Sequence, residues 1–219
     1  MKITQFKAVI LDMDGVFIDT ETFIFDIFRR VFAPYNISPS NEYQYKFIGQ
    51  PFSSNLVDIR KDFGIDFDDN ALRQQFDDTY EEMLHTSSLD VQDGIKDIIN
   101  QVKKHHQKLG LCTTSTRHHV DAVFARVKIK SFDPTLLFDA VVTGDSVTHR
   151  KPHAEPYLRA AEKLGESPKD CFVIEDSLSG ITSAKAAGCF CAGLRQAYNR
   201  HIDFSAADVV IERLEQVLA

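Results

Sequence analysis

Charged and hydroxyl side chains that suit phosphate and metal chemistry follow several short apolar runs of this sequence. In chain order they are Asp12 and Asp14, Thr113 and Thr114, Lys151, and Glu175 with Asp176. If the runs are strands of one parallel sheet, these side chains meet where the carboxyl ends of the strands lie, and ligands of such sheets bind there. Carboxylates, hydroxyls and a lysine at one edge indicate a magnesium and phosphate site.

The two aspartates after the first run cannot share one task. Asp12 and Asp14 are two residues apart, so an extended backbone points their side chains to opposite sides. One of them can face the substrate as a nucleophile while the other acts over it as general acid and base. A carboxylate nucleophile gives an aspartyl-phosphate intermediate, which divides phosphoryl transfer into two easier steps.

The acidic residues also offer oxygen ligands for a metal ion. Mg²⁺ prefers a few carboxylates, retained waters and substrate phosphate oxygens. Asp12 and Asp176 can supply carboxylates, and the backbone carbonyl of Asp14 can supply a third ligand. Glu175 can orient a metal-bound water. We therefore expect magnesium as the cofactor.

Phosphate partners are expected from a hydroxyl-rich turn and from the lysine. Thr113 and Thr114 open a strand-to-helix turn whose backbone N–H groups and hydroxyls suit a phosphate. Lys151 would neutralise charge on the aspartate and on the phosphoryl group during transfer.

Each of these groups taken alone has an ordinary structural explanation. The Asp-x-Asp pair fits a turn, residues 113–116 fit a helix cap, and residues 175–176 fit the acidic start of a helix. Lys151 alone fits a solvated side chain, and Asp145 stays open between a supporting role at the site and a turn. The functional interpretation rests on the combination, because these groups follow the strands in order with carboxylates facing a cation.

Six apolar runs have the length and composition of buried strands. They are residues 8–11, 109–112, 138–142, 171–174, 189–192 and 207–211. Near-continuous apolar strands are what a parallel sheet covered on both faces requires. Apolar stripes at helical spacing lie between them, at 95–102, 156–164 and 179–187. The chain of 219 residues is therefore predicted to form a doubly wound, Rossmann-like α/β sheet.

About a hundred residues separate the first two apolar runs, which is too long for one crossover connection. This segment has helical patterns of its own, at 23–32, 56–63 and 72–84. The simplest account is a small α-helical domain of residues 19–88 inserted into a catalytic core of residues 1–18 and 89–219. The two chain crossings would act as hinges, so that the insert could cover one end of the sheet as a cap.

The composition excludes several classes of protein. With 25 basic and 32 acidic side chains the net charge is −7, and no long basic run is present, which argues against nucleic acid or an anionic membrane as partner. No apolar stretch approaches the roughly 20 residues that span a bilayer. The four cysteines form no C-x-x-C pair, so we expect buried, reduced thiols.

We expect a cytoplasmic monomer or weak dimer with a small phosphorylated substrate.

Two histidines invite a metal assignment that the sequence does not favour. His149 and His153 are four residues apart, but they straddle Pro152, which interrupts a helix. They are not expected to share a helix face, and we expect no zinc site there.

The segments around the candidate residues resemble the four motifs of the haloacid dehalogenase (HAD) superfamily, in its branch with a helical cap after the first motif. The matching segments are 9–16, 111–113, 151–152 with 155–157, and 173–180. The resemblance covers nearly the whole chain outside the expected cap. It implies Asp12 as nucleophile and Asp14 as general acid and base. It implies Thr113 and Lys151 as phosphate partners, and Mg²⁺ at Asp12, Asp14 and Asp176.

Within this superfamily the sequence favours hydrolysis of a phosphate ester. Asp14 argues against a dehalogenase, which resembles the first motif only at its first aspartate. A phosphonate hydrolase needs a cap lysine for a Schiff base, and neither Lys46 nor Lys61 sits in a visibly apolar setting. Compared with β-phosphoglucomutase, the chain has Ile24 in place of a cap histidine and Phe52 in place of a cap arginine that grips a second phosphate.

We therefore expect a magnesium-dependent phosphatase of a small metabolite such as a sugar phosphate. A phosphomutase of the β-phosphoglucomutase type is the alternative, because Asp19, Thr20 and the fourth motif resemble that enzyme. A catalytically silent protein that binds a phosphorylated ligand or a protein partner is the alternative of another class. The intact set of acidic residues and the lysine argue against this second alternative.

Overall fold

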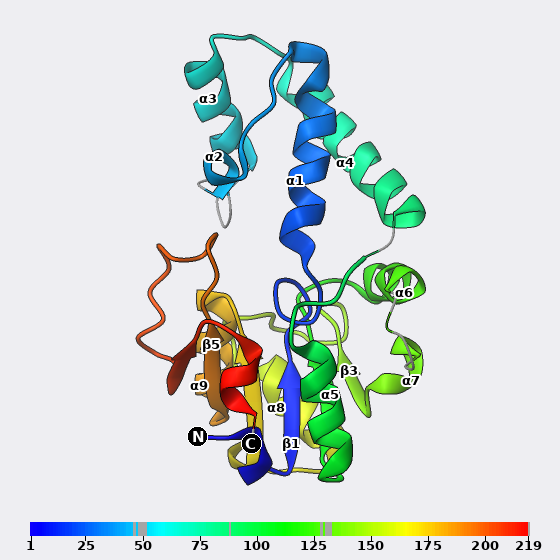
Figure 1. Cartoon of the computed structure of the whole chain (residues 1–219), viewed down its shortest axis with the longest axis vertical. Coiled ribbons are helices and arrows are strands. Elements are labelled where there is room, and N and C mark those ends of the chain that lie inside the picture. Colours follow the sequence, from blue (N-terminus) through cyan, green and yellow to red (C-terminus); the bar gives the residue numbers. More distant parts are fainter. Residues whose placement is uncertain (46, 48–51, 88, 128, 130–132, 219) are drawn as a thin grey trace.

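The protein consists of a parallel β-sheet with helices on both faces and a helical layer beyond the carboxyl edge of the sheet (Figure 1). The computed structural model describes residues 1–45, 47, 52–87, 89–127, 129 and 133–218. The strands are β1 (Ala8–Leu11), β2 (Lys108–Cys112), β3 (Ala140–Val142), β4 (Cys171–Glu175), β5 (Phe190–Leu194) and β6 (Val209–Ile211). All neighbours are parallel, in the order β3-β2-β1-β4-β5-β6. The predicted doubly wound α/β fold is confirmed, and its strand order reverses between β1 and β4.

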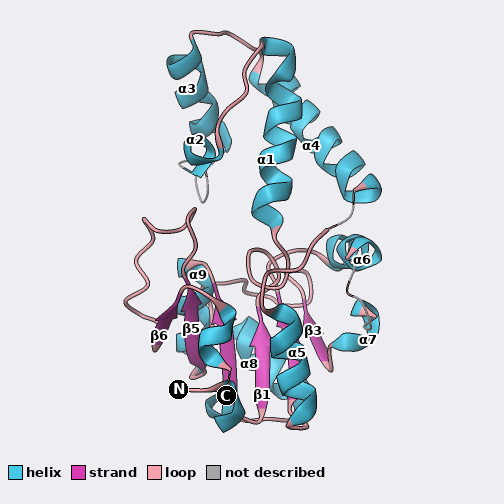
Figure 2. Cartoon of the chain, viewed as in Figure 1, coloured by secondary structure: helices cyan, strands magenta, loops and turns pink. Residues whose placement is uncertain are grey.

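Alternation along the strands divides the core of the sheet into two halves. On β1, Val9 and Leu11 belong to one buried cluster and Ala8 and Ile10 to the other, because successive side chains of a strand point to opposite faces. The covering helices are α5 (Ile95–Lys104) and α6 (Arg117–Arg126) on the first face, and α8 (Glu155–Leu164) and α9 (Leu178–Ala187) on the second. Figure 2 shows this layered arrangement. All four residues of β1 are buried, so the strand that leads to Asp12 is fixed from both sides.

The third and sixth strands begin two residues later than the sequence predicts. The residues before them are aspartates that pair through their backbone N–H and through their side-chain carboxylate. The carboxylate of Asp139 accepts the backbone N–H of Leu109 at 2.8 Å, and that of Asp208 accepts the N–H of Cys191 at 2.7 Å. The apolar runs therefore mark the strands correctly, but just before β3 and β6 a carboxylate takes the place of one backbone acceptor.

The described residues between β1 and α5 form the helices α1 (Thr20–Phe32), α2 (Asn41–Tyr45), α3 (Phe52–Phe63) and α4 (Asp69–Thr86). Helices α1 and α4 start where an aspartate caps the first turn. The side chain of Asp19 accepts the N–H of Thr22, and that of Asp68 accepts the N–H of Ala71. Phe28 of α1 packs against Phe32, Phe47 and Phe76, so aromatic rings hold this layer together.

The helical layer is joined to the sheet by two chain crossings that lie side by side. Ile18 forms an antiparallel bridge with Val91. A further contact links the layers, because Tyr80 of α4 stacks on His119 of α6 with 5.7 Å between ring centroids. This arrangement supports the division into a core and an inserted domain of residues 19–88, which stays a prediction.

The remaining elements are short. They are α7 (Pro134–Leu137) and 3₁₀-helices at Ile3–Gln5, Ala33–Tyr35, Pro168–Asp170 and Leu214–Val217. None of the helices in the described part of the chain has both the length and the apolar character needed to cross a bilayer. All four cysteines are buried and unpaired, as the sequence predicts.

The buried sheet gives a direct test of the packing. Leu111 of β2 is fully buried, whereas Leu136 of α7 is 83% exposed. We expect Leu111→Ala to lower the free energy of unfolding by about 2–5 kcal/mol through lost burial and a cavity. The matched change Leu136→Ala should alter it by less than about 0.5 kcal/mol. Urea unfolding of both variants measures this, and equal effects would contradict the placement of β2 in the core.

Candidate active site

The predicted site residues gather beyond the carboxyl ends of β1, β2 and β4. A cavity of about 450 Å³ opens there. Its lining includes Asp12, Asp14, Thr114, Lys151, Asp176 and Tyr198. This is the edge at which the strand order reverses, where open α/β sheets bind their ligands.

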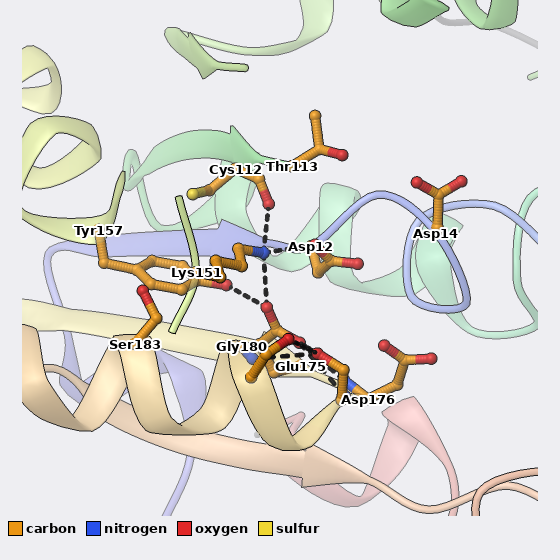
Figure 3. Close-up of polar contacts among 12 residues, drawn as sticks. Asp12, Asp14, Cys112, Thr113, Lys151, Tyr157, Glu175, Asp176, Gly180 and Ser183 are labelled. Carbon is orange, nitrogen blue, oxygen red and sulfur yellow. Dashed lines mark hydrogen bonds and ion pairs between the residues drawn. The ribbon is translucent and has the colours of Figure 1, made fainter. Parts of the chain in front are cut away.

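Lys151 lies at the centre of the site and is buried. Its ammonium donates to Asp12 Oδ1 and to Glu175 Oε1, both at 2.6 Å, and to the backbone carbonyl of Cys112 at 2.9 Å (Figure 3). Only 3% of the Lys151 side chain is exposed. All three protons of the ammonium therefore have partners inside the protein. The explanation of Lys151 as a solvated side chain is wrong.

The charges in this cluster depend on one another. Burial lowers the pKa of Lys151, but the carboxylates of Asp12 and Glu175 outweigh it and hold that pKa well above its ordinary value. Burial raises the pKa of Asp12 to about 8, assisted by Glu175 and Asp14 and opposed by Lys151. Carboxylates thus outnumber the single cation, and an added positive charge would stabilise the ionised form of Asp12.

Glu175 has both carboxylate oxygens engaged. Besides Lys151, its Oε1 accepts the hydroxyl of Tyr157 at 2.6 Å, and its Oε2 accepts the hydroxyl of Ser177 at 3.0 Å. The backbone N–H groups of Asp176 and Ser177 also point to Oε2, at 3.2 and 3.3 Å. Glu175 is fully buried, so its geometry suits positioning of Lys151 and of the following turn.

Gly180 makes room for this carboxylate. A Cβ atom at Gly180, in the first turn of α9, would overlap the carboxyl group of Glu175. The helix that covers β4 can therefore approach the site only because this residue has no side chain. The glycine in the fourth predicted motif has a steric role that its type alone did not reveal.

Asp176 is held by the loop after β5. Its Oδ2 accepts the hydroxyl of Tyr198 at 2.5 Å, and its backbone carbonyl accepts the side-chain amide of Asn199 at 2.9 Å. Asn199 also donates to the carbonyl of Leu194 at the end of β5. Sequence reasoning missed Tyr198 and Asn199, because they lie in a loop with no periodic pattern.

Asp14 lies apart from the lysine cluster, as its spacing from Asp12 predicts (Figure 3). Its Oδ2 accepts the hydroxyl of Ser115 at 3.3 Å. Burial raises the pKa of Asp14, whereas His119 and the Ser115 hydroxyl act to lower it. Gly15 allows the turn that follows, because its φ is +79° and a Cβ there would overlap the Asp176 carboxylate. Asp14 is therefore held near the site in an environment that favours its protonated form.

The hydroxyl-rich turn after β2 contains residues that hold the backbone and one residue that lines the cavity. Thr113 is buried and its hydroxyl accepts the N–H of Ser115 at 3.1 Å, while Thr114 lines the cavity. The Thr116 side chain accepts the N–H of His119, which makes it the N-cap of α6. The helix-cap explanation thus holds for Thr116.

Asp145 belongs to a turn. Its carboxylate accepts the hydroxyl of Thr143 at 2.6 Å and the backbone N–H of Arg117 at 3.1 Å. These bonds fasten the loop after β3 to the start of α6. Of the two possibilities that the sequence left open, the contacts favour the turn.

Three carboxylates form a possible metal-binding group. Asp12, Glu175 and Asp176 each offer an oxygen, and these oxygens lie within 4.8 Å of one another. An all-oxygen donor set facing a cavity suits Mg²⁺, which keeps waters and substrate oxygens in its coordination shell. Glu175 is fully buried with donors on both oxygens, whereas Asp12 and Asp176 line the cavity, so Asp12 and Asp176 fit the ion better.

The chain is similar to known proteins over most of its length. Residues 9–194 match the model of the haloacid dehalogenase-like hydrolase family. Protein CbbY of Rhodobacter capsulatus is 30% identical over 210 residues, which cover 93% of this chain and 92% of that protein. A phosphorylated carbohydrates phosphatase of Thermotoga maritima is 31% identical over 183 residues, 83% of this chain and 82% of that one. A solved structure of a putative β-phosphoglucomutase from Thermotoga maritima matches with a TM-score of 0.75 and 28% identity, covering 96% of both chains.

The α/β sheet and the acidic site at its carboxyl edge define a HAD-type hydrolase. The chain belongs to the haloacid dehalogenase-like hydrolase family. The family and the phosphatases among its relatives support a phosphatase enzyme, as the sequence predicts.

The contact between Gly180 and Glu175 can be tested by adding one methyl group. We expect Gly180→Ala to displace Glu175 and with it Lys151, and to lower kcat/KM for an aryl phosphate by about 10²-fold. Thr182→Ala, at an exposed position of the same helix, serves as the control. Steady-state hydrolysis measures both variants, and wild-type kinetics in Gly180→Ala would show that the close approach is not needed.

Proposed function

We propose that the protein is a magnesium-dependent phosphatase of a small phosphorylated metabolite, with Asp12 as the nucleophile. The observation that carries this proposal is the buried ammonium of Lys151 between Asp12 and Glu175 at the cavity. Lys151 holds Oδ1 of Asp12, which fixes the carboxylate and leaves Oδ2 to attack phosphorus. The same ammonium can neutralise charge on the phosphoryl group in transfer. Thr113 and Thr114 are proposed as further phosphate partners, through the turn that they open.

The reaction takes place in two steps. In the first, a bond forms between Asp12 and phosphorus while the phosphorus–oxygen bond to the leaving group breaks, and Asp14 gives its proton to the leaving oxygen. In the second, water attacks phosphorus, Asp14 takes a proton from that water, and phosphate and free Asp12 are released. The raised pKa of Asp14 suits this role, because it keeps the proton on the acid for the first step.

Mg²⁺ would be held by Asp12 and Asp176, with the backbone carbonyl of Asp14 as a further ligand. When bound, the ion supplies positive charge to the carboxylate and to the phosphate oxygens. Glu175 is proposed to support the metal site from outside the ion's coordination shell. Its carboxylate positions Lys151 and the backbone N–H of Asp176.

A second cavity offers space for the leaving group. It measures about 370 Å³, and Asp14 and Thr20 line both this cavity and the one described above. Phe23, Ile24 and Tyr80 give it an apolar wall. Such a surface fits a small uncharged organic group, and the carbohydrate phosphatase of Thermotoga maritima supports a sugar phosphate as the class.

The same lining favours a phosphatase over a phosphomutase. A mutase must hold a second phosphate, and no lysine or arginine lines this second cavity among the residues that the structure describes. Ile24, which stands in place of the cap histidine of a mutase, lines this second cavity. Lys46, a candidate for a Schiff base, lies outside the described residues, while Phe52 begins α3. Lys61, the other candidate for a Schiff base, is exposed on α3.

Two assays test the proposed function. Hydrolysis of an aryl phosphate with and without Mg²⁺ separates an enzyme from a silent binding protein, which would release no phosphate. Supplying β-glucose 1-phosphate with a trace of the 1,6-bisphosphate separates the two enzymes. Glucose 6-phosphate formed much faster than free phosphate would identify a mutase. The cytoplasmic location and the monomer or weak dimer stay predictions.

The nucleophile assignment predicts a sharp contrast between two conservative variants. Asp12→Asn should lose essentially all turnover with every substrate, because an amide cannot attack phosphorus. Asp14→Asn should lose about 10²–10⁴ in kcat with alkyl phosphates, whose leaving group needs a proton, and less with activated aryl phosphates. Initial rates on both substrate types measure the contrast. If Asp12→Asn keeps more than a few per cent of the wild-type kcat, Asp12 is not the nucleophile.

The metal assignment predicts a shift in the magnesium requirement. Asp176→Ala should raise the half-saturating Mg²⁺ concentration by more than about 10-fold, because it removes a direct ligand. Asp121→Ala, an exposed carboxylate of α6, is the control and should leave it unchanged. The measurement is a magnesium titration of initial rate, and equal half-saturation for Asp176→Ala and wild type would refute the assignment.

A further inference from the structure

A turn outside the catalytic cavity brings two imidazoles and a carboxylate together. His149, His153 and Glu155 each offer a ligand atom, and these three atoms lie within 4.8 Å of one another. The two imidazole ring centroids are 4.6 Å apart. The sequence argued against a metal here because Pro152 prevents a shared helix face. The turn before α8 makes the pair meet without a helix, so that argument no longer applies.

Hydrogen bonds position these side chains. His149 Nδ1 lies 2.9 Å from Glu155 Oε2, and because an ionised carboxylate can only accept, Nδ1 carries the proton in the absence of metal. An ion bound by Nδ1 and by the same carboxylate would replace this proton, while Nε2 points away from Glu155. His153 Nδ1 accepts the backbone N–H of Glu155 at 3.1 Å, which directs its Nε2 away from the backbone.

The carboxylate is ionised and retains room for a ligand bond. The backbone N–H groups of Thr148 and His149 donate to Glu155 at 2.8 Å each, and they lower its pKa to about 2. With the His149 ring, three donors occupy the roughly four acceptor positions that a carboxylate has. One position therefore remains for a cation.

The turn is anchored to the core while its two imidazoles are exposed. The carbonyl of His153 accepts the hydroxyl of Ser183, which is fully buried in α9. The side chain of His149 is 62% exposed. Ligands of a tetrahedral zinc ion with bonds of about 2.0–2.2 Å lie about 3.4 Å apart, so the exposed rings need to move by little more than an ångström.

We propose that His149, His153 and Glu155 form a binding site for a zinc-class transition-metal ion, separate from the catalytic magnesium site. Two imidazoles and one carboxylate select Zn²⁺ and its neighbours over Mg²⁺, which prefers oxygen ligands alone. Waters complete the coordination. The ion ties together residues on either side of Lys151, and so links the two ends of the segment that carries the catalytic ammonium.

Cobalt titration of the untagged full-length protein tests this site, with Mg²⁺ in large excess to occupy the catalytic carboxylates. We expect one Co²⁺ per chain to bind with visible absorption bands typical of nitrogen-containing, four-coordinate cobalt, and Zn²⁺ to abolish these bands. The variant with His149→Ala and His153→Ala should lose the bands, whereas a control with His105→Ala and His118→Ala, two exposed histidines elsewhere, should keep them.

Glu155→Gln tests the carboxylate separately. It should weaken cobalt binding by about 10–100-fold while the two histidines remain. Thermal unfolding without metal checks that each variant is folded. The proposal is overturned if wild type binds no cobalt in excess Mg²⁺, or if the variant without His149 and His153 gives the wild-type spectrum.

Discussion

The buried ammonium of Lys151 ties the three central strands of the sheet together. Its acceptors are Asp12 after β1, the carbonyl of Cys112 at the end of β2, and Glu175 at the end of β4. Leu11 pairs with Leu111 on one side and with Ile174 on the other, so the three acceptors are the next residues in register on the three strands. A slip of one strand by one residue would replace an acceptor and leave a buried charge without a partner, which is costly.

The same interaction explains why so many neighbouring groups are constrained. Glu175 can hold Lys151 only if its own remaining lone pairs are satisfied, and Tyr157, Ser177 and the following amides do this. α9 must then start close to the carboxylate, which requires Gly180. The burial of the Lys151 ammonium thus constrains the position of the whole helix α9. It also fixes Asp12 beside the cavity.

Much of this arrangement could be predicted from the sequence, because buried parallel strands are continuous apolar runs that end at polar residues. That pattern located Asp12, Asp176 and Lys151 at one edge without any knowledge of the fold. It could not locate Tyr198, whose contact with Asp176 depends on a loop after β5. Tyr157 is buried within the apolar face of α8, and its hydroxyl bond to Glu175 has no signature in helical spacing.

Two further features of the structure have causes that the sequence patterns did not reveal. The runs that became β3 and β6 have an aspartate as their second residue, and its carboxylate replaces a backbone acceptor, which hydrophobicity does not reveal. For His149 and His153, the sequence argument considered only a helix face as a way to bring two side chains together. A turn can do the same, and its geometry depends on contacts with the nearby Glu155 and with Ser183, which is distant in sequence.

The pairing of Ile18 with Val91 has a consequence for how the molecule can vary. Residues opposed in an antiparallel bridge have Cα atoms about 4.5–5.5 Å apart, so the long excursion through α1 to α4 leaves and rejoins the sheet at almost one point. The entropy of closing a loop rises only slowly with its length. Helices can therefore be lengthened, shortened or exchanged there with little effect on the strands below, and the wall that α1 and α4 give to the second cavity is free to diversify while Asp12 and Lys151 stay in place.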